Sequence, residues 1–447
     1  MLFQSQAAKF VSTALKAAVD QADRQRKERA SKLLLMYQGE QEIFIRDNLS
    51  RTHKQPERLT PLFVNIVRKV INLKAMVYAQ DCRRTIEGTE TDQKIFTEIE
   101  TGSNLAVAMK MCDQLVKLLG TVLLRVVWRG GKIEIDILPG DILDVQTGAS
   151  PSFLEEVVIT HQNEDPSEIT YSRWTAELVQ KLDYRGQILS QEPNPYGVLP
   201  FIPVFSSPPL DDSFWQAGAV DLASIQDAIN QILTDALFTA RFQSYSLLYI
   251  KGAKIEGRKE FTVGPGQVIH LPENGAIGFA SPEAHLLESL EAVQTLMRQA
   301  AMTNGLSASS VDLKSVAESG RAKLVDNAEI QEARINDQAN FRRVEDLLFD
   351  LCRRVWNTFN PTRKISETAI LWCDFFKPEV LSIYEKIENW RTLLDLRLIS
   401  PVDVIMEMNP DLSRQAAAEK LRQTQNEIAE FEPHIMPNLK NLFPPIE

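Results

Sequence analysis

The chain has 447 residues, of which 44% are hydrophobic and 24% charged. This length and composition predict a globular protein of roughly two to four structural units and exclude a disordered or collagen-like chain. The 49 Lys and Arg residues are outnumbered by 60 Asp and Glu, which gives a formal net charge of −11. Tight nucleic-acid binders are usually basic, because they neutralise phosphates, so the charge excludes such a role for the chain as a whole.

The cysteines indicate a reducing compartment. Cys82, Cys112, Cys352 and Cys373 form no C-x-x-C pair, which argues against a zinc site or a disulfide framework. Cys112 and Cys352 lie in helical patterns, which favours buried thiols at these two positions. The N-terminal segment is charged throughout and lacks the apolar core of a signal peptide. The most apolar run, residues 118–128, is too short to span a bilayer. We therefore expect a soluble protein made in the cytosol.

The first part of the chain is predicted to be a helical layer. Apolar residues recur there at helical spacing, a Thr60-Pro61 pair is a helix-start signal, and Gly120 suits a helix C-cap. The expected helices span residues 1–48, 60–78 and 92–119.

A β region is predicted next. Two strand-like runs flank Gly130 and Gly131, which is a strong signal for a β-hairpin. The expected strands span residues 121–128, 133–138, 155–162, 169–172, 175–182 and 187–191, and residues 194–205 are expected to be extended. The sheet that these strands form should be mixed and mostly antiparallel.

A long amphipathic helix is predicted after Gly218, about 24 residues and roughly 36 Å long. Gln226 and Asn230 are assigned to its polar faces. Its narrow apolar stripe favours packing against neighbouring helices over burial in a large core. The stripe includes Ile225, Ile229, Ile232, Leu233 and Leu237.

The remaining elements alternate between helices and short β segments. Glycine and proline residues over 249–280 predict a compact β excursion, and Pro282 opens a helix. The apolar face of that helix holds Leu286, Leu287, Leu290, Val293, Leu296 and Met297. A polar loop is expected over 303–319, with Asn304-Gly305 as a hinge, before a long helix that follows Gly320. A strand at 369–373, helices at 378–396, 401–408 and 413–430, and an extended arm over 433–447 complete the chain. This order predicts an α+β fold that is mainly α.

The sequence lacks the common catalytic motifs. It contains no Walker-type phosphate loop, no dinucleotide fingerprint and no G-x-S-x-G elbow. The carboxylate pairs Asp211-Asp212 and Glu345-Asp346 fit a loop and a solvated helix face. We therefore expect no enzyme, no cofactor and no metal, and assign no catalytic, cofactor-binding or metal-binding residue.

One basic cluster has two readings. Lys251, Lys254, Arg258 and Lys259 are interleaved with acidic residues. They form either a solvated loop or a basic rim that meets DNA phosphates or an acidic partner.

Five segments are specific in combination: Ile225–Asn230 with Thr234-Asp235, Glu318–Leu324, Asp374–Glu379, Leu398–Asp403 and Asn409–Ser413. With these segments, the succession of parts resembles the portal protein, or head-to-tail connector, of tailed bacteriophages. The resemblance covers about residues 60–430, with Arg321 and Lys323 where the family usually carries neutral residues.

The resemblance implies a division into the regions of a portal-type fold. These are a wing over 1–217, a first stem helix over 218–248, a clip over 249–282, a second stem helix over 283–302, a tunnel loop over 303–319, a long helix and returning wing strand over 320–375, and a crown with a C-terminal arm over 376–447.

It also implies a function. About twelve copies would form a ring around a central channel at one capsid vertex. The ring would be the conduit for packaging and ejection of double-stranded DNA, which passes without sequence specificity. The implied partners are the terminase large subunit, a head-tail adaptor or tail protein, and the major capsid and scaffolding proteins. The protein would assemble in the host cytoplasm and reside in the virion, with no membrane partner.

Three sets of residues follow from the resemblance. The candidates that face DNA in the tunnel loop are Asn304, Ser307, Ser309 and Lys314. The candidates for docking of the motor or adaptor in the clip are Lys251, Lys254, Arg258 and Lys259. The stem-packing candidates are Ile225, Ile229, Ile232, Leu233 and Leu237.

The acidic charge fits a conduit, because a ring of about twelve copies carries about −130 and repels phosphate. Two other classes stay open. One is a different oligomeric virion scaffold or adaptor, and the other is an enzyme whose scattered carboxylates converge only in the folded chain.

Overall fold

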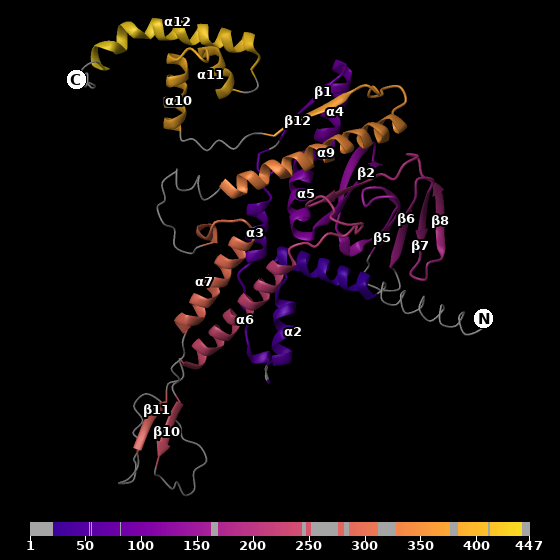
Figure 1. The fold of residues 1–447 in the computed structure, drawn as a ribbon, viewed down its shortest axis with the longest axis vertical. Helices are drawn as coiled ribbons and strands as arrows, with labels where there is room; N and C mark the ends of the chain where they lie inside the picture. The colour runs from indigo at the N-terminus through magenta and orange to yellow at the C-terminus, as the bar shows by residue number, and fades with distance from the viewer. Residues whose placement is uncertain are drawn as a thin grey trace. The chain divides into compact units, whose positions relative to one another are not determined.

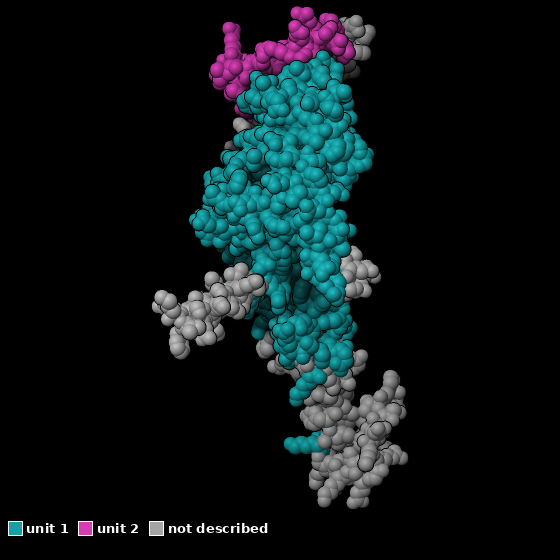
Figure 2. Space-filling view, turned by 90° about the vertical axis from the view of Figure 1, so that its right-hand side faces the viewer, with its two compact units in different colours: residues 1–317, 325–376 teal, residues 318–324, 377–447 magenta. Residues whose placement is uncertain are grey.

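The computed structural model divides the chain into two compact units, which Figure 2 colours separately. Unit 1 comprises residues 1–317 and 325–376, and unit 2 comprises 318–324 and 377–447. The structure describes residues 21–52, 54, 56–80, 82–161, 169–243, 247–251, 276–280, 286–311, 328–375, 383–409 and 412–439. Their helices and strands are labelled in Figure 1.

The N-terminal helix is shorter than predicted. It runs over residues 21–38 and stops at Gly39, whose φ of 99° is open to glycine but strained for other residues. Helix α2 (Glu42–Thr52) follows after this break. The expectation of one helix over 1–48 is therefore wrong at Gly39, and its first twenty residues lie outside the described part.

The predicted helix start at Thr60-Pro61 is also wrong. After a 3-10 turn, η1 (Pro56–Arg58), residues 61–65 have no helical structure and helix α3 spans Ile66–Lys74. Asn65 is the N-cap, since its side chain accepts a hydrogen bond from the backbone N–H of Arg68. The backbone just before α3 bonds instead to side chains of a distant helix, as described below.

The helix expected over 92–119 is two helices, α4 (Glu90–Ser103) and α5 (Leu105–Leu119). Asn104 separates them with φ 52° and ψ 46°, a left-handed conformation that asparagine tolerates. Gly120 closes α5 as predicted, and its N–H donates to the Val116 carbonyl. A Cβ at Gly120 would lie 2.6 Å from the Gln216 carbonyl oxygen, so no side chain fits there.

A three-stranded antiparallel sheet of order β3-β2-β9 lies beside these helices. Its strands are β2 (Thr121–Arg129), β3 (Lys132–Leu138) and β9 (Phe201–Phe205). The predicted hairpin is confirmed, because β2 and β3 pair from Leu123↔Leu138 to Arg129↔Lys132. Gly130 and Gly131 form its turn with φ 56° and 83°.

A second antiparallel sheet has the order β4-β5-β6-β7-β8. Four of its strands were predicted to within a few residues, whereas β4 was not. Strand β4 has only five residues and directly follows the short turn η2 (Gly140–Ile142), although Leu143-Asp144-Val145-Gln146 alternates apolar and polar side chains. The strands are β4 (Leu143–Thr147), β5 (Leu154–His161), β6 (Thr170–Trp174), β7 (Leu178–Leu182) and β8 (Ile188–Pro193).

The later elements of unit 1 include two helices that pack side by side, α6 (Val220–Gln243) and α7 (Leu286–Thr303) (Figure 1). Between these helices in sequence, β10 (Leu247–Lys251) pairs antiparallel with β11 (Ala276–Ala280). This pairing agrees with the β excursion predicted for this part of the chain. The turn η4 (Ala308–Val311) and helix α9 (Ala328–Phe359) follow. The predicted start of the long helix at residues 320–327 lies outside the described residues.

The last strand of unit 1 pairs with one that the sequence did not reveal. β12 (Ile370–Asp374) is antiparallel to β1 (Arg83–Glu87), with Thr85 opposite Trp372. β1 has only five residues and its partner lies far along the chain, so its local sequence carried little signal.

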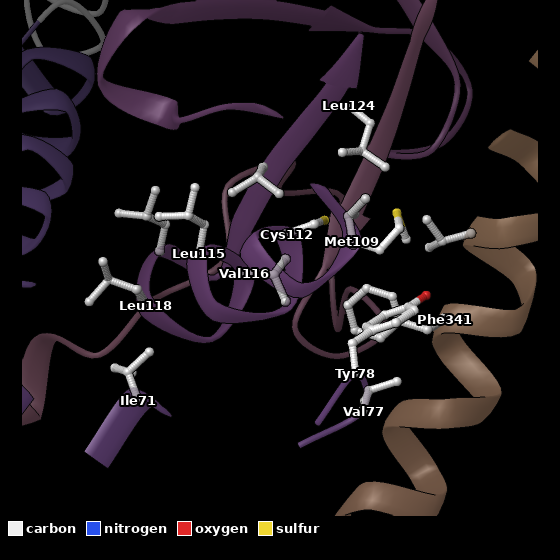
Figure 3. Packing of buried hydrophobic residues seen from close by; sticks show 14 of the residues in the cluster. Ile71, Val77, Tyr78, Met109, Cys112, Leu115, Val116, Leu118, Leu124 and Phe341 are labelled. Carbon is white, nitrogen blue, oxygen red and sulfur yellow. The ribbon is translucent and has the colours of Figure 1, made fainter. Parts of the chain in front are cut away.

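The main core of unit 1 joins α3, α4, α5, β2, α6, α7 and α9. Figure 3 shows part of this core around α5, with Phe341 of α9 next to Tyr78. Their rings meet edge to face, with centroids 5.3 Å apart. All four cysteines are buried and none forms a disulfide, which confirms the buried thiols predicted at Cys112 and Cys352.

A buried charge cluster ties β1 to α9. Arg84 Nε donates to Glu345 Oε2 at 2.9 Å and its Nη2 donates to Oε1 at 2.8 Å. The Tyr78 hydroxyl donates to the same Oε1 at 2.7 Å. Arg84 is 7% exposed and Glu345 is 1% exposed, so neither charge has water as an alternative partner.

Unit 2 is helical in its described residues, with α10 (Ile383–Asp395), α11 (Pro401–Met408) and α12 (Arg414–Leu439). The three predicted helices are confirmed. The extended arm expected from residue 433 is wrong up to Leu439, because α12 continues through Pro433 and Pro437 despite the poor helix propensity of proline.

The units together form an α+β fold. Among the described helices, none has both the length and the apolar character that crossing a membrane requires.

Substituting Arg84→Met should leave Glu345 buried without its cation. We expect the free energy of unfolding to fall by about 3–5 kcal/mol, measured by denaturant titration of the full chain. The matched control is Arg83→Met at the neighbouring exposed position of β1, which should change it by less than about 0.5 kcal/mol. Equal unfolding midpoints for the two variants would contradict the structural role of Arg84.

Candidate functional site

Three buried polar side chains form a ladder along one face of α6. Gln226, Asn230 and Thr234 are each four residues apart and are 0%, 2% and 1% exposed. Gln226 Nε2 donates to Asn230 Oδ1 at 2.7 Å, and Asn230 Nδ2 donates to Gln41 Oε1 at 2.8 Å. The ladder therefore connects α6 to the turn between the N-terminal helix and α2.

The ladder also binds the backbone that precedes α3. Gln226 Oε1 accepts from the N–H groups of Ile66 and Val67, at 2.8 and 3.2 Å, and so caps the first turn of α3. Its Nε2 donates to the Val64 carbonyl at 2.9 Å. Thr234 Oγ1 accepts from the Leu62 N–H at 3.2 Å. These bonds hold the segment before α3 on α6 and explain why the helix does not start at Thr60.

Gln226 and Asn230 therefore lie outside the apolar stripe of α6, as predicted, but both side chains are buried, which the sequence did not indicate. The expectation that the apolar stripe avoids a large core is wrong for Ile229 and Leu233, which are 0% and 9% exposed within the main core. Ile225 and Ile232 pack against that core and are half-buried. Leu237 is half-buried as well. These five side chains thus pack largely inside their own chain.

Helix α7 packs on unit 1 over only part of its length. Val293, Met297 and Ala300 are buried in the main core. Toward the N-terminus of the helix, Leu290 is 52% exposed and Leu287 is 77% exposed. The predicted apolar face is therefore confirmed at Val293 and Met297, while its beginning is not covered by the described part of the chain.

The turn after α7 is anchored. Gly305 has φ 69°, and Leu306 and Val311 are each 4% exposed in the main core. The Asn304 side chain donates to the Ala300 carbonyl at 2.9 Å and accepts from Lys74 Nζ at 2.9 Å. The expected loop over 303–319 is therefore packed over its described part, residues 303–311.

Of the other tunnel-loop candidates, Ser307 and Ser309 belong to the described part of the chain. Ser307 is half-buried and Ser309 is exposed, and their hydroxyl oxygens are 2.9 Å apart. Lys314 lies outside the described residues. Of the basic cluster, Lys251 is exposed at the end of β10, while Lys254, Arg258 and Lys259 lie outside the described residues.

Four polar or charged side chains gather next to this turn and are called the polar seam: Lys74, Lys117, Asn304 and Asp337. Lys117 Nζ of α5 is 2.6 Å from Asp337 Oδ1 of α9. Lys74, Lys117, Asn304 and Asp337 line a cavity of about 270 Å³. Burial lowers the pKa of Lys74, and the nearby Lys117 cation lowers it further. The seam joins α3, α5, α9 and the turn through charged side chains.

Asp113 of α5 is the most buried acid of this region, with 0% exposure. Its Oδ2 accepts from the Val77 N–H at 3.0 Å, and its Oδ1 has no hydrogen-bond partner. Burial raises the pKa of Asp113 to about 7, although the Lys117 cation opposes the rise. Asp113 thus titrates near neutral pH in the folded chain.

One group of possible metal ligands occurs among the described residues. Cys82, Glu345 and Cys373 place three ligand atoms within 4.8 Å of one another. Both carboxylate oxygens of Glu345 already accept hydrogen bonds from Arg84. The hydrogen bond with Cys373, together with desolvation by burial, holds the pKa of Cys82 above its usual range. The arrangement therefore serves as a hydrogen-bonded link between β1, β12 and α9.

Sequence reasoning missed the ladder and the seam for different reasons. The ladder had a usable signal, because Gln226, Asn230 and Thr234 repeat at the four-residue spacing of one helix face. The seam residues come from separate elements, and nothing in their local sequence links Lys74 with Asn304 or Lys117 with Asp337.

Comparisons with known proteins give matches only among solved structures. No protein-family model and no curated protein matches the sequence. The chain is similar to a chain of the "Neck of empty GTA particle computed with C6 symmetry", with 15% identity over 76% of this chain and 88% of that chain, and a TM-score of 0.45.

It is also similar to a chain of the "Virion of native gene transfer agent (GTA) particle", with 15% identity, the same coverage of 76% and 88%, and a TM-score of 0.42. A chain of the "Neck of native GTA particle computed with C12 symmetry" matches at 15% identity over 77% and 89%, with a TM-score of 0.43. At these identities and TM-scores, the similarity by itself assigns no function to this chain.

Substituting Gln226→Leu should remove the bonds that Gln226 makes to the Val67 N–H and to Asn230 Oδ1. It should also leave the Ile66 N–H and the Val64 carbonyl with only the 2.9 Å bond between them. We expect a loss of roughly 3 kcal/mol or more in the free energy of unfolding, since each buried unsatisfied group costs about 1–3 kcal/mol. The matched control is Gln231→Leu on the exposed face of α6. If both variants melt at the same temperature, the ladder does not hold α3 to α6.

The raised pKa of Asp113 predicts a pH effect with a definite sign. Between its unfolded value of 3.8 and about 7, the folded chain binds more protons than the unfolded chain, so this group lowers stability as pH rises. The stability of Asp113→Asn relative to wild type should therefore rise by roughly 1 kcal/mol per pH unit across this window and then level off. Melting curves at several pH values test this, with the exposed Asp212→Asn as the control for loss of one charge. A constant difference between Asp113→Asn and wild type would contradict it.

Proposed function

We propose that this chain is a portal protein of a phage-like particle. About twelve copies form a ring at one capsid vertex, and double-stranded DNA passes through its channel during packaging and ejection. The ring docks the terminase large subunit and later a head-tail adaptor or tail protein, beside the major capsid and scaffolding proteins.

The proposed regions follow the described elements. α6 and α7 are the stem helices, and β10 and β11 belong to the clip between them. Residues 303–319 are the tunnel loop, whose described part begins at the anchored turn after α7. The helices of unit 2 belong to the crown.

The observation that carries the proposal is the uncovered beginning of α7. Its core-facing stripe continues past Val293 to Leu290, which is 52% exposed, with Leu287 beside it at 77%. Exposed large apolar side chains at a helix end favour contact with another protein surface. In a ring, the stem of the next copy supplies that surface through a heterologous contact.

The charge supports a passage that does not grip DNA. The chain carries −11, so a ring of copies repels phosphate along its length. Lys251 at the end of β10, with Lys254, Arg258 and Lys259, gives the clip a local basic rim for the motor or adaptor. Energy for DNA movement comes from the motor in this proposal, because the sequence has no nucleotide-binding loop.

The double variant Leu287→Asp, Leu290→Asp tests the proposal. The wild-type chain should sediment mainly as one large closed oligomer, and the variant should shift to monomer. Because both side chains are exposed in the monomer, its melting temperature should stay close to that of wild type.

The matched control is Gln299→Asp, which adds charge at an exposed position of the same helix. It should assemble like wild type in sedimentation velocity. A wild-type chain that stays monomeric at every concentration, or a double variant that assembles at wild-type yield, would refute the stem assignment.

A further inference from the structure

Two buried cysteines meet where β1 pairs with β12. Cys82 directly precedes β1 and is 5% exposed, and Cys373 lies in β12 and is 8% exposed. Their Sγ atoms lie within 4.8 Å of each other, and the two side chains share a hydrogen bond. We call Cys82 and Cys373 the thiol pair. Sequence spacing could not reveal this pair, because its members come from strands far apart in the chain.

The register of the two strands sets this proximity. Cys373 lies opposite Arg84, and Cys82 comes two residues before Arg84, so the three side chains share the buried face of the sheet. The thiol pair is therefore a diagonal pair across the two strands. Cys82 lies just outside the ladder, which begins at Arg83, so its backbone can adjust while the strands stay paired. A disulfide has an S–S distance of about 2.0 Å, so the sulfurs need to approach by less than about 3 Å.

Loss of the two thiol protons would leave the neighbouring Glu345 fully held. Cys82 Sγ lies 3.8 Å from Glu345 Oε1, and a thiol is a weak hydrogen-bond donor. Glu345 keeps two hydrogen bonds from Arg84 and one from the Tyr78 hydroxyl. Oxidation of the thiol pair therefore strands no buried charge.

The thiol pair is protected against brief contact with an oxidant. Both side chains are buried, and the raised pKa of Cys82 keeps it in the thiol form, whereas the thiolate is the reactive species. The sheet that covers the pair has only two strands of five residues each, and such a sheet is marginally stable by itself. Oxidation should therefore be slow and should proceed through local opening of β1 and β12.

We propose that the thiol pair is a redox site, which forms a disulfide between Cys82 and Cys373 when the protein meets a small disulfide such as oxidised glutathione. The thiolate of one cysteine attacks a sulfur of oxidised glutathione, forms a mixed disulfide and releases one glutathione thiolate. The thiolate of the other cysteine then attacks the protein sulfur of the mixed disulfide and releases the second glutathione thiolate. The two leaving thiolates take up the two protons that the cysteines lose. Two protein thiols and one small disulfide thus become one protein disulfide and two small thiols.

The disulfide closes the long loop between residues 82 and 373 and holds β12 on β1. A crosslink over so long a loop stabilises a fold mainly by restricting the unfolded chain. Under the proposed function, the thiol pair stays reduced in the host cytoplasm and is oxidised after the particle is released. Formation of the bond needs neither a ring nor DNA, so its test is independent of that function.

Mass spectrometry of the full chain tests the proposal. Folded wild-type protein is incubated for several days with oxidised glutathione and EDTA, remaining thiols are alkylated in denaturant, and the chain is digested without reduction. The peptide that contains Cys82 should be joined to the peptide that contains Cys373, while Cys112 and Cys352 are alkylated. The thiol count should fall from four to two and return to four with dithiothreitol. The incubation is repeated in urea below the unfolding transition, which promotes local opening.

Thermal melting gives a second readout. Oxidised wild type should melt about 5 °C above reduced wild type, because the crosslink restricts the unfolded chain. Cys373→Ala should lose this rise. The matched control Cys352→Ala, at another buried cysteine, should keep it. Each variant is compared with its own reduced form, so the cost of removing a buried thiol cancels.

The possible outcomes decide the proposal. Four alkylated thiols after both incubations, with and without urea, overturn it. A mixed disulfide at Cys82 or Cys373 that never converts to the protein disulfide also overturns it, because the two sulfurs then cannot meet. Crosslinks through Cys112 or Cys352 in place of the thiol pair overturn it as well. A chain that forms the Cys82–Cys373 disulfide but never assembles supports the proposal and contradicts the proposed function.

Discussion

The buried polar ladder on α6 sets the arrangement of unit 1. Gln226, Asn230 and Thr234 bind backbone and side-chain groups from the turn before α2 and from the segment before α3. Because the three ladder side chains are at most 2% exposed, each lost bond would leave a buried polar atom of the ladder without that partner. The ladder thus fixes where α3 starts and how the N-terminal layer lies on α6. Since α7 packs on α6, it also determines where the exposed beginning of α7 emerges.

The exposed apolar side chains distinguish the parts of the fold that a single chain stabilises from the surface that a partner covers. Around α5 and β2 the packing is closed, with aromatic contacts and a fully paired buried Glu345. At the first turns of α7, large apolar side chains stay in water. Under the proposed function this part of α7 is a subunit contact, and a conduit needs no catalytic group. The acidic charge then keeps the DNA from adhering to the wall.

The sequence predicted the elements whose signals are local. The Gly130-Gly131 turn specifies its hairpin, and the apolar spacing after Gly218 specifies α6. The sequence-based prediction failed where contacts between residues far apart in the chain determine the local structure. Thr60-Pro61 has a good helix-start pattern, but Gln226 caps the chain six residues later. β1 becomes a strand only beside β12, and Asn104 breaks a helical pattern through a left-handed conformation that many asparagines do not adopt. The apolar stripe of α6 was recognised as a packing face from its helical spacing, and its role as a stem stays a prediction. The buried role of Gln226 and the Lys74–Asn304 bond required the folded chain.

The central claim is that the single chain is a subunit and that only its closed assembly has the activity. Electron micrographs of the purified wild-type protein, sorted into class averages, test this most directly. The account predicts end views that are rings of one dominant symmetry, with a central hole wide enough for duplex DNA. Averages that show only compact monomers, two-fold dimers or open filaments would contradict it.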